Sequence, residues 1–314
     1  MSAGIVVVGD VMVDVVAMLP GPLAHGSDTP AAIEHRQGGS GANVAAGLGR
    51  GAFVGRVGAD GLGDAAVGAL VGVEVHVQRD PLRPTGTCIV LVHPGGERTM
   101  VPDAGANDGL EAVELPAGAH LHVTGYGLLR EGSRMAVLDA LAQASARGMS
   151  ISVDPSSAAP LAAVGAERFL GWVAGAGLLL ANADEARALT GEADPERAAL
   201  ALARRLSPGR PLWASRRQAS TSSASAGRSR HSEVVVKLGA GGALWTDGSR
   251  VLRAPAEPVA VVDTTGAGDA FAAGLLAARA DGAEPAEALA AGCRLAARAV
   301  GIRGARLRST SQST

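Results

Sequence analysis

The stretch DTTGAGDAF, residues 263–271, carries the strongest local signal in this chain. It follows a strand-like run at 259–262, and a helical run begins at about Asp269. Small residues let the backbone approach a ligand, and the first amides of a helix stabilise an anion together with the helix dipole. A carboxylate beside such an anion is what phosphoryl transfer to an alcohol requires. A helix start capped by Thr and Gly, common in α/β proteins, would give the same local pattern.

Outward from this stretch, short β-branched or aliphatic runs alternate with alanine-rich helical runs. This alternation predicts a three-layer α/β fold with a mostly parallel central sheet, whose ligand site lies beyond the carboxyl ends of the strands. The strand-like runs are at 5–8, 121–123, 151–153, 178–180 and 234–236, and the helical runs are at 134–146, 195–206 and 270–279.

Two segments do not fit the alternation, because they contain turn residues and short alternating stretches. The Pro-Gly-Gly turn at 94–96 separates two strand-like runs and predicts a hairpin. We expect the two segments to form either a small β-sheet lid over the site or ordinary surface hairpins. Residues 214–232, rich in Ser, Arg, Ala and Thr, predict a flexible insertion, and the polar tail predicts a frayed end. The expected division is a core of 1–14, 38–83 and 107–307, a lid of 15–37 and 84–106, and a tail of 308–314.

Three further patterns contain polar residues at expected strand or helix ends. GGSGANVA at 38–45 opens a helical run, and its paired glycines and Asn43 could hold a hydroxyl-rich ligand or simply cap the helix. Asp10 and Asp14 follow the first strand and suit either vicinal hydroxyls or a turn. Asn182 and Glu185 follow the strand at 178–180 and could either hold hydrated Mg²⁺ or cap a helix.

Composition limits the class of protein. The chain has 314 residues, 47% apolar and 18% charged, which is ordinary for a folded globular protein. A formal net charge of -2 argues against a nucleic-acid partner. Cys88 and Cys293 lie far apart, which favours a reduced cytoplasmic protein over a disulfide framework. Asp10 and Asp14 interrupt the apolar first residues, so we expect neither an export signal nor a membrane segment.

Taken together, the motifs at 38–45, 182–185 and 263–271, in this order, resemble the PfkB/ribokinase family of carbohydrate kinases from about Gly4 to Gly304. The resemblance implies a ribokinase-like fold with a β-sheet lid and an ATP-dependent, Mg²⁺-requiring transfer of phosphate to a sugar hydroxyl. It implies that Asp269 is the catalytic base. The backbone amides that would form the anion hole are those of Gly266, Ala267 and Gly268.

The same resemblance implies the other ligand contacts. The residues that would hold the sugar are Asp14, Gly39 and Asn43. Those near ATP would be Asn182, Lys237 (the only lysine of the chain), Gly239 and Gly242. Glu185 would act on Mg²⁺ through water, and Asp263 and Thr265 match positions that bind a monovalent cation such as K⁺. As in some relatives, an exposed lid edge could pair two subunits into a homodimer.

The sequence also departs from the family pattern and leaves alternatives. Ser40 stands where ribokinases proper usually have lysine, which makes ribose a less secure substrate. A nucleoside kinase is the alternative within the family, although aromatic residues make up only 2% of the chain and Tyr126 is its only tyrosine. A non-catalytic sugar- or nucleotide-binding protein would not need Asp269. An NAD-linked oxidoreductase would need a dinucleotide fingerprint after the first strand, which is absent from this sequence.

Overall fold

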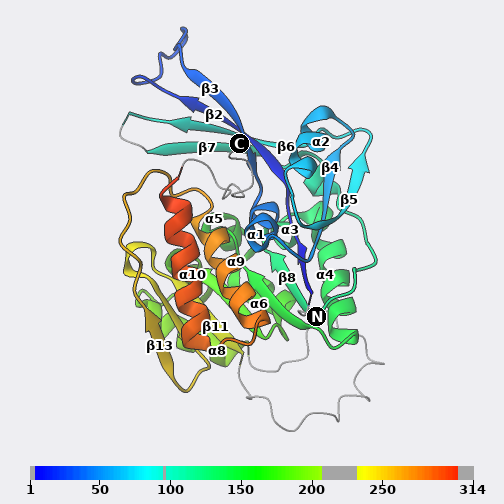
Figure 1. Ribbon diagram of the computed structural model, residues 1–314, viewed down its shortest axis with the longest axis vertical. Helices are drawn as coiled ribbons and strands as arrows, with labels where there is room; N and C mark the ends of the chain where they lie inside the picture. The colour runs from blue at the N-terminus through cyan, green and yellow to red at the C-terminus, as the bar shows by residue number, and fades with distance from the viewer. Residues whose placement is uncertain (1–3, 95–96, 207–231, 303–314) are drawn as a thin grey trace.

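A nine-stranded sheet lies between two layers of helices in the computed structural model, which describes residues 4–94, 97–206 and 232–302 (Figure 1). The strand order is β13-β12-β11-β10-β9-β8-β1-β4-β5. The strands from β11 to β5 run parallel, whereas β12 and β13 pair antiparallel. The strands are β1 (Ile5–Val8), β4 (Ala52–Gly58), β5 (Glu74–Asp80), β8 (His120–Thr124), β9 (Ser150–Asp154), β10 (Leu178–Asn182), β11 (Glu233–Lys237), β12 (Ala243–Thr246) and β13 (Val251–Ala254).

Helices cover both faces of this sheet and divide the core into two apolar clusters. On one face lie α3 (Tyr126–Leu129), α4 (Glu131–Ala146), α5 (Ala158–Val164), α6 (Ala166–Val173), α7 (Ala183–Thr190) and α8 (Pro195–Arg205). On the other lie α1 (Ser40–Leu48), α2 (Gly61–Gly68), α9 (Ala267–Ala280) and α10 (Pro285–Val300). Two short 3₁₀ turns, η1 (Gly105–Gly109) and η3 (Gly239–Gly241), complete the described elements. The predicted three-layer α/β fold is therefore confirmed.

The five strand-like runs of the sequence all lie in strands of this sheet, because a strand buried on both faces is mostly apolar; the buried polar exceptions in these runs are His122 and Ser152. The prediction of a strand at 259–262 is wrong. Val259, Val261 and Val262 are exposed by 40%, 69% and 49% in an irregular segment. This segment is held by the amides of Val262 and Asp263, which donate to the Val300 carbonyl oxygen. It leads into α9, which begins two residues before the predicted start.

The lid is a separate four-stranded sheet in the order β3-β2-β6-β7, drawn at the top of Figure 1. It consists of β2 (Met12–Met18), β3 (Ala32–Gly38), β6 (Gly86–Val92) and β7 (Arg98–Asp103). The predicted hairpin at Pro94 is confirmed, since β6 and β7 pair antiparallel. β2 and β6 pair parallel, and β3 and β7 form the two edges. The division of the chain into core and lid segments remains a prediction at the level of its boundaries.

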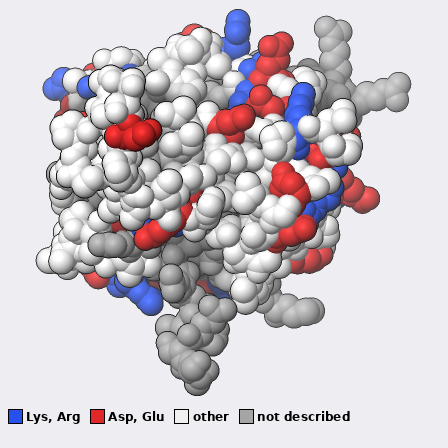
Figure 2. Space-filling view, turned by 90° about the horizontal axis from the view of Figure 1, so that it is seen from above, with Lys and Arg blue, Asp and Glu red and all other residues white. Residues whose placement is uncertain are grey.

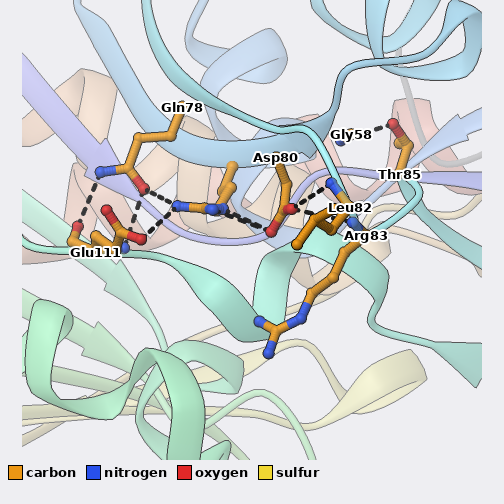
Figure 3. Close-up of polar contacts among 8 residues, drawn as sticks. Gly58, Gln78, Asp80, Leu82, Arg83, Thr85 and Glu111 are labelled. Carbon is orange, nitrogen blue, oxygen red and sulfur yellow. Dashed lines mark hydrogen bonds and ion pairs between the residues drawn. The ribbon is translucent and has the colours of Figure 1, made fainter.

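A polar cluster fixes the point where the chain leaves β5 for the lid (Figure 3). One carboxylate oxygen of Asp80 accepts from Arg56, and the other accepts from the amides of Leu82 and Arg83. These backbone hydrogen bonds, with Arg56, lower the pKa of Asp80 to about 2. Beside this turn, the Thr85 hydroxyl oxygen accepts from the Gly58 amide at 3.0 Å. The segment between β5 and β6 is therefore anchored to the core where the lid strand β6 begins.

The sequence also led to expectations about a flexible insertion, a frayed tail, membrane segments and surface charge. Of the predicted flexible insertion, 214–231 lies outside the described residues, as does the predicted tail at 308–314. Among the residues that are described, no helix is both long and apolar enough to cross a membrane. Where Figure 2 shows described side chains, acidic and basic groups are interspersed on the face seen from above and form no continuous basic patch.

Candidate active site

Asp269 lies in the first turn of α9, which begins after Gly266 in a left-handed conformation (φ 73°). Its two carboxylate oxygens accept hydrogen bonds from two residues of α1. The Ser40 hydroxyl donates to Oδ1 at 2.7 Å, and the Asn43 amide donates to Oδ2 at 2.9 Å. The structure thus brings the predicted base together with Asn43, a predicted sugar contact more than 200 residues away.

The electrostatics of Asp269 suit a base that works near neutral pH. Its half-buried position disfavours the charged form and raises its pKa to about 7. The hydrogen bonds from Ser40 and Asn43 oppose this shift, the nearby Asp154 carboxylate adds to it, and Lys237 opposes it. A carboxylate with this pKa can accept a proton from a hydroxyl and return it without a large penalty in either direction.

The backbone amides predicted to form an anion hole lie at the start of α9. The amides at the start of a helix have no acceptor within the helix. Here the Ala267 amide donates across the turn to the Thr264 carbonyl oxygen at a long 3.3 Å. Gly268 borders a cavity, and a Cβ built on it would lie 3.4 Å from the Lys237 ammonium nitrogen. A phosphoryl oxygen placed at Gly268 would therefore have a cation beside it.

The predicted sugar contacts lie at the junction of the sheet and the lid. Asp14, on β2, is only 7% exposed, and a Cβ on Gly38 would lie 2.4 Å from its carboxylate oxygen, so a larger residue at position 38 would displace this carboxylate. Gly39 has φ 89°, and a Cβ there would lie 2.7 Å from the Asp10 carbonyl oxygen. Asp10 itself accepts from the Ser40 and Gly41 amides at 3.3 Å, so it anchors the start of α1.

Lys237, which the family resemblance places near ATP, is the last residue of β11. Its immediate partner was not predicted. The Lys237 ammonium donates to the Asp154 carboxylate at 2.6 Å, and both side chains are largely buried, with 14% and 6% exposure. Burial alone would lower the pKa of Lys237, but Asp154 and Glu185 outweigh it and keep that pKa raised. Asp154 ends strand β9, so the rule that polar residues at the carboxyl ends of strands form the site could have identified it.

Asn182 and Glu185 form a reciprocal cap at the start of α7. The Asn182 side-chain oxygen accepts from the Glu185 amide, and the Glu185 carboxylate accepts from the Asn182 amide, each at 2.8 Å. Glu185 is 1% exposed, and burial with the nearby Asp154 raises its pKa to about 7. The capping alternative is therefore realised in this structure. Within the described part of the chain, no group of three or more His, Cys, Asp or Glu side chains could hold a metal ion.

A cavity of about 550 Å³ borders the first turn of α9. Lys237, Gly239 and Gly242 line it, together with Gly268. Gly242 must be glycine, since it has φ 83° and a Cβ would lie 2.0 Å from the Ala254 carbonyl oxygen. The remaining walls are mostly apolar and were not predicted; they include Val259, Val261, Phe271, Cys293, Ala297 and Val300.

Asp263 and Thr265, predicted to bind a monovalent cation, lie against the lid, where Asp263 contacts two arginines and Thr265 contacts one of them. Arg98 lies 2.9 Å from Asp263 Oδ1 and donates to the Thr265 hydroxyl at 2.5 Å. Arg36 lies 3.3 Å from Asp263 Oδ2. Sequence reasoning missed both arginines, because the local pattern of an exposed strand does not indicate which distant residue an arginine on it contacts.

This geometry agrees with the comparisons. The model of the pfkB family carbohydrate kinases matches residues 2–312. The chain belongs to this family. It is 32% identical to a 2-dehydro-3-deoxygluconokinase of Thermoproteus tenax, over 96% of this chain and 89% of that protein. It is 31% identical to a fructokinase of Salmonella typhimurium, over 91% of this chain and 87% of that protein.

Two solved structures of the same architecture show the ribokinase-like fold of this family member. A putative ribokinase II from E. coli has a TM-score of 0.80 at 22% identity, covering 96% of this chain and 94% of its own. An adenosine kinase from Sinorhizobium meliloti has a TM-score of 0.81 at 24% identity, covering 99% of this chain and 97% of its own. The fold alone thus does not separate sugar from nucleoside acceptors. The 2-dehydro-3-deoxygluconokinase and the fructokinase, which are similar in sequence over most of the chain, are both named as sugar kinases.

Proposed function

We propose that the protein is an ATP-dependent kinase that transfers the γ-phosphoryl group to a hydroxyl of a small sugar. The observation that carries this proposal is the position of Asp269. Its carboxylate accepts from Asn43, a proposed sugar contact on α1, and Gly268 in the same helix turn lines the 550 Å³ cavity. An acceptor hydroxyl and a nucleoside triphosphate could therefore meet at one helix start.

In the proposed mechanism each residue acts on charge or position. Asp269 takes the proton of the acceptor hydroxyl, for which a positioned base contributes about 10²–10⁴-fold. The backbone at 266–268 and the Lys237 ammonium stabilise the oxygens of the migrating group. Asp14, Gly39 and Asn43 hold the sugar. Mg²⁺ bound with ATP would neutralise the phosphates, and Glu185 would reach it only through water and only by giving up part of its cap.

The cavity suits the nucleotide because of its composition. Apart from Glu257, the walls from 256–261 and α10 are apolar and match a flat heteroaromatic base, and Lys237, which also lines the cavity, matches the phosphates. Gly239 and Gly242 allow the backbone to approach the ligand. Asn182, at the neighbouring strand end, completes the proposed nucleotide contacts.

A panel assay tests this proposal. ADP release should be measured with ribose, fructose, 2-keto-3-deoxygluconate, adenosine and pseudouridine as acceptors. We expect turnover with at least one sugar. Turnover with a nucleoside alone would favour the nucleoside kinase. Tyr126 would then be the stacking residue, since it is close enough to Asp269 for that carboxylate to help raise the pKa of Tyr126. No turnover with any acceptor would favour a non-catalytic binding protein.

The assembly and location of the protein form a second part of the proposal. The outward face of the lid exposes Ile33 by 63%, Ile89 by 48% and Val101 by 55%, and strand register places all three on one face. We propose that this face pairs with that of a second copy, since such an apolar patch is favoured by burial. Light scattering should show a dimer that Ile89→Glu disrupts; a wild-type monomer would contradict it. Buried, unpaired Cys88 and Cys293 agree with the proposed cytoplasmic location.

The predicted K⁺ at Asp263 and Thr265 remains a prediction. The contacts of these two residues with the lid arginines argue for a different cation in its place.

A further inference from the structure

Two arginines from opposite edges of the lid sheet converge on one carboxylate of the core. Arg36 comes from edge strand β3 and Arg98 from edge strand β7. Their guanidinium groups lie 3.3 Å and 2.9 Å from the two oxygens of Asp263, which is 7% exposed. Arg98 also donates to the Thr265 hydroxyl at 2.5 Å and to the Thr264 hydroxyl at 3.4 Å. These contacts join the lid to the core directly before α9.

The carboxylate of Asp263 connects the lid arginines to the turn that precedes α9. Asp263 Oδ1, which Arg98 contacts, also accepts from the Thr265 amide at 2.8 Å. Gly266 follows immediately and sets the start of α9 with its positive φ. Fixing Asp263 and Thr265 therefore fixes the backbone that the proposed function uses to hold a phosphoryl group.

The ligand atoms expected for a monovalent cation are already engaged. Each oxygen of Asp263 contacts a guanidinium, and the Thr265 hydroxyl oxygen accepts from Arg98. Arg36 also pairs with Glu34 at 2.8 Å, so each of the two guanidiniums contacts at least one carboxylate. An added cation would compete for the same oxygens and meet like charge at close range. The side chains of this cluster therefore do not fit a resident K⁺ while the lid is in this position.

We propose that the Arg98 guanidinium takes the place of the monovalent cation, with Arg36 as its partner, and that lid closure orders the turn before α9. Arg98 is then a positioning residue, since it acts on the phosphoryl group through Asp263 and Thr265. The kinetic part of this inference rests on the proposed kinase function. Turnover does not depend on K⁺, because the activating charge is part of the chain.

The first test does not depend on catalysis. Thallium(I), an anomalous scatterer that replaces K⁺, should be soaked into crystals of the wild-type protein and of Arg98→Ala, which removes the guanidinium from both Asp263 Oδ1 and the Thr265 hydroxyl. We expect a thallium peak between these two residues in Arg98→Ala and none in the wild type. In parallel, replacing tetramethylammonium chloride by KCl at equal ionic strength should raise the melting temperature of Arg98→Ala only. A wild-type thallium peak there, or no cation effect in Arg98→Ala, would overturn the proposal.

The second test uses turnover with whichever acceptor the panel identifies. Wild-type kcat should be equal in KCl and in tetramethylammonium chloride. In tetramethylammonium chloride, Arg98→Ala should lose about 10-fold to 100-fold in kcat, as expected for a misplaced turn, and K⁺ or free guanidinium should restore part of it. Arg98→Lys should retain more activity, and Arg50→Ala, which removes an arginine paired with Asp281 at the far end of α9, should behave as wild type.

The kinetic outcomes are decisive in both directions. A wild type that needs K⁺ would overturn the proposal. So would an Arg98→Ala variant that raises KM for an anionic acceptor only, with kcat unchanged in every salt, because Arg98 would then bind substrate. If the wild type phosphorylates no acceptor, the kinase proposal fails, while the thallium and melting results still decide whether a guanidinium occupies the cation position.

Discussion

Removing one hydrogen bond to Asp269 should move the pH dependence of turnover by a calculable amount. The Ser40 hydroxyl donates to the Asp269 carboxylate at 2.7 Å and stabilises its charged form. A hydrogen bond to a charged group contributes about 1.5–3 kcal/mol, and one pKa unit corresponds to about 1.4 kcal/mol. Because Ser40 is only half-buried and water can replace part of its contribution, we expect Ser40→Ala to raise the pKa of Asp269 by about one unit.

The direction of the effect follows from the role of the carboxylate. A base must be ionised, so kcat/KM of the wild type should fall as pH decreases through about 7, the pKa of Asp269. In Ser40→Ala this acid limb should move to about pH 8, and kcat/KM at pH 7 should fall about fivefold, because the ionised fraction drops from about one half to about one tenth.

The assay is ADP release at low acceptor concentration from pH 5.5 to 9.5, since kcat/KM reports the free enzyme. Ser40→Thr retains the hydroxyl and serves as the matched control, with an unshifted profile. A Ser40→Ala profile that coincides with the wild type, or a wild-type profile that is flat between pH 6 and 8, would refute the assignment of the acid limb to Asp269.

Two further predictions concern buried charge. Lys237→Met should lower the free energy of unfolding at pH 7.5 by about 3–5 kcal/mol in urea titrations, because Asp154 and Glu185 lose their countercharge; a loss below 1 kcal/mol would contradict this pairing. Burial lowers the pKa of His122 to about 3 from its ordinary 6.5, so between these two pH values the unfolded chain binds one proton that the folded chain does not. The free energy of unfolding should therefore decline as pH falls below about 6.5, by about 3 kcal/mol at pH 4. His122→Leu should remove this share of the slope and leave that of His120, whose pKa is about 4; equal slopes in both proteins would contradict it.

Five of the parallel strands, β1, β8, β9, β10 and β11, could be predicted because they are buried on both faces. Runs such as Val234–Val236 have no polar position to hide, and the polar residue after each run lies at the common carboxyl edge of the sheet. This rule predicted Asn182, whereas Lys237 was implied by the family resemblance; the rule could also have identified Asp154, which follows Ile151-Ser152-Val153. The alternation of elements thus predicts both the fold and the edge at which the site forms.

The valines at 259–262 show where the same rule fails. A β-branched run is apolar both in a buried strand and in the wall of a ligand cavity, and local sequence does not distinguish the two. In the structure Val259 and Val261 line the cavity beside Gly268 and remain exposed. Their apolar character therefore relates to the proposed nucleotide site and not to the sheet.

Long-range polar contacts were the part that the sequence could not predict. Arg36 is 227 residues from Asp263, and Arg98 is 167 residues from Thr265. Both arginines occur on lid strands whose other residues are partly exposed, where charged side chains are ordinary. Only the packing of the lid against the core shows that they meet the turn before α9.

The central claim, that Asp269 is the base of a kinase, is tested most directly by replacing its carboxylate with an isosteric amide. In Asp269→Asn we expect kcat for ADP release to fall at least about 100-fold. ATP binding, measured by calorimetry, should stay near wild type, because the cavity proposed to hold the nucleotide is lined by Gly268 and not by Asp269. Asp281→Asn, at the opposite end of the same helix, should leave kcat unchanged. Turnover of Asp269→Asn close to that of the wild type would contradict the account.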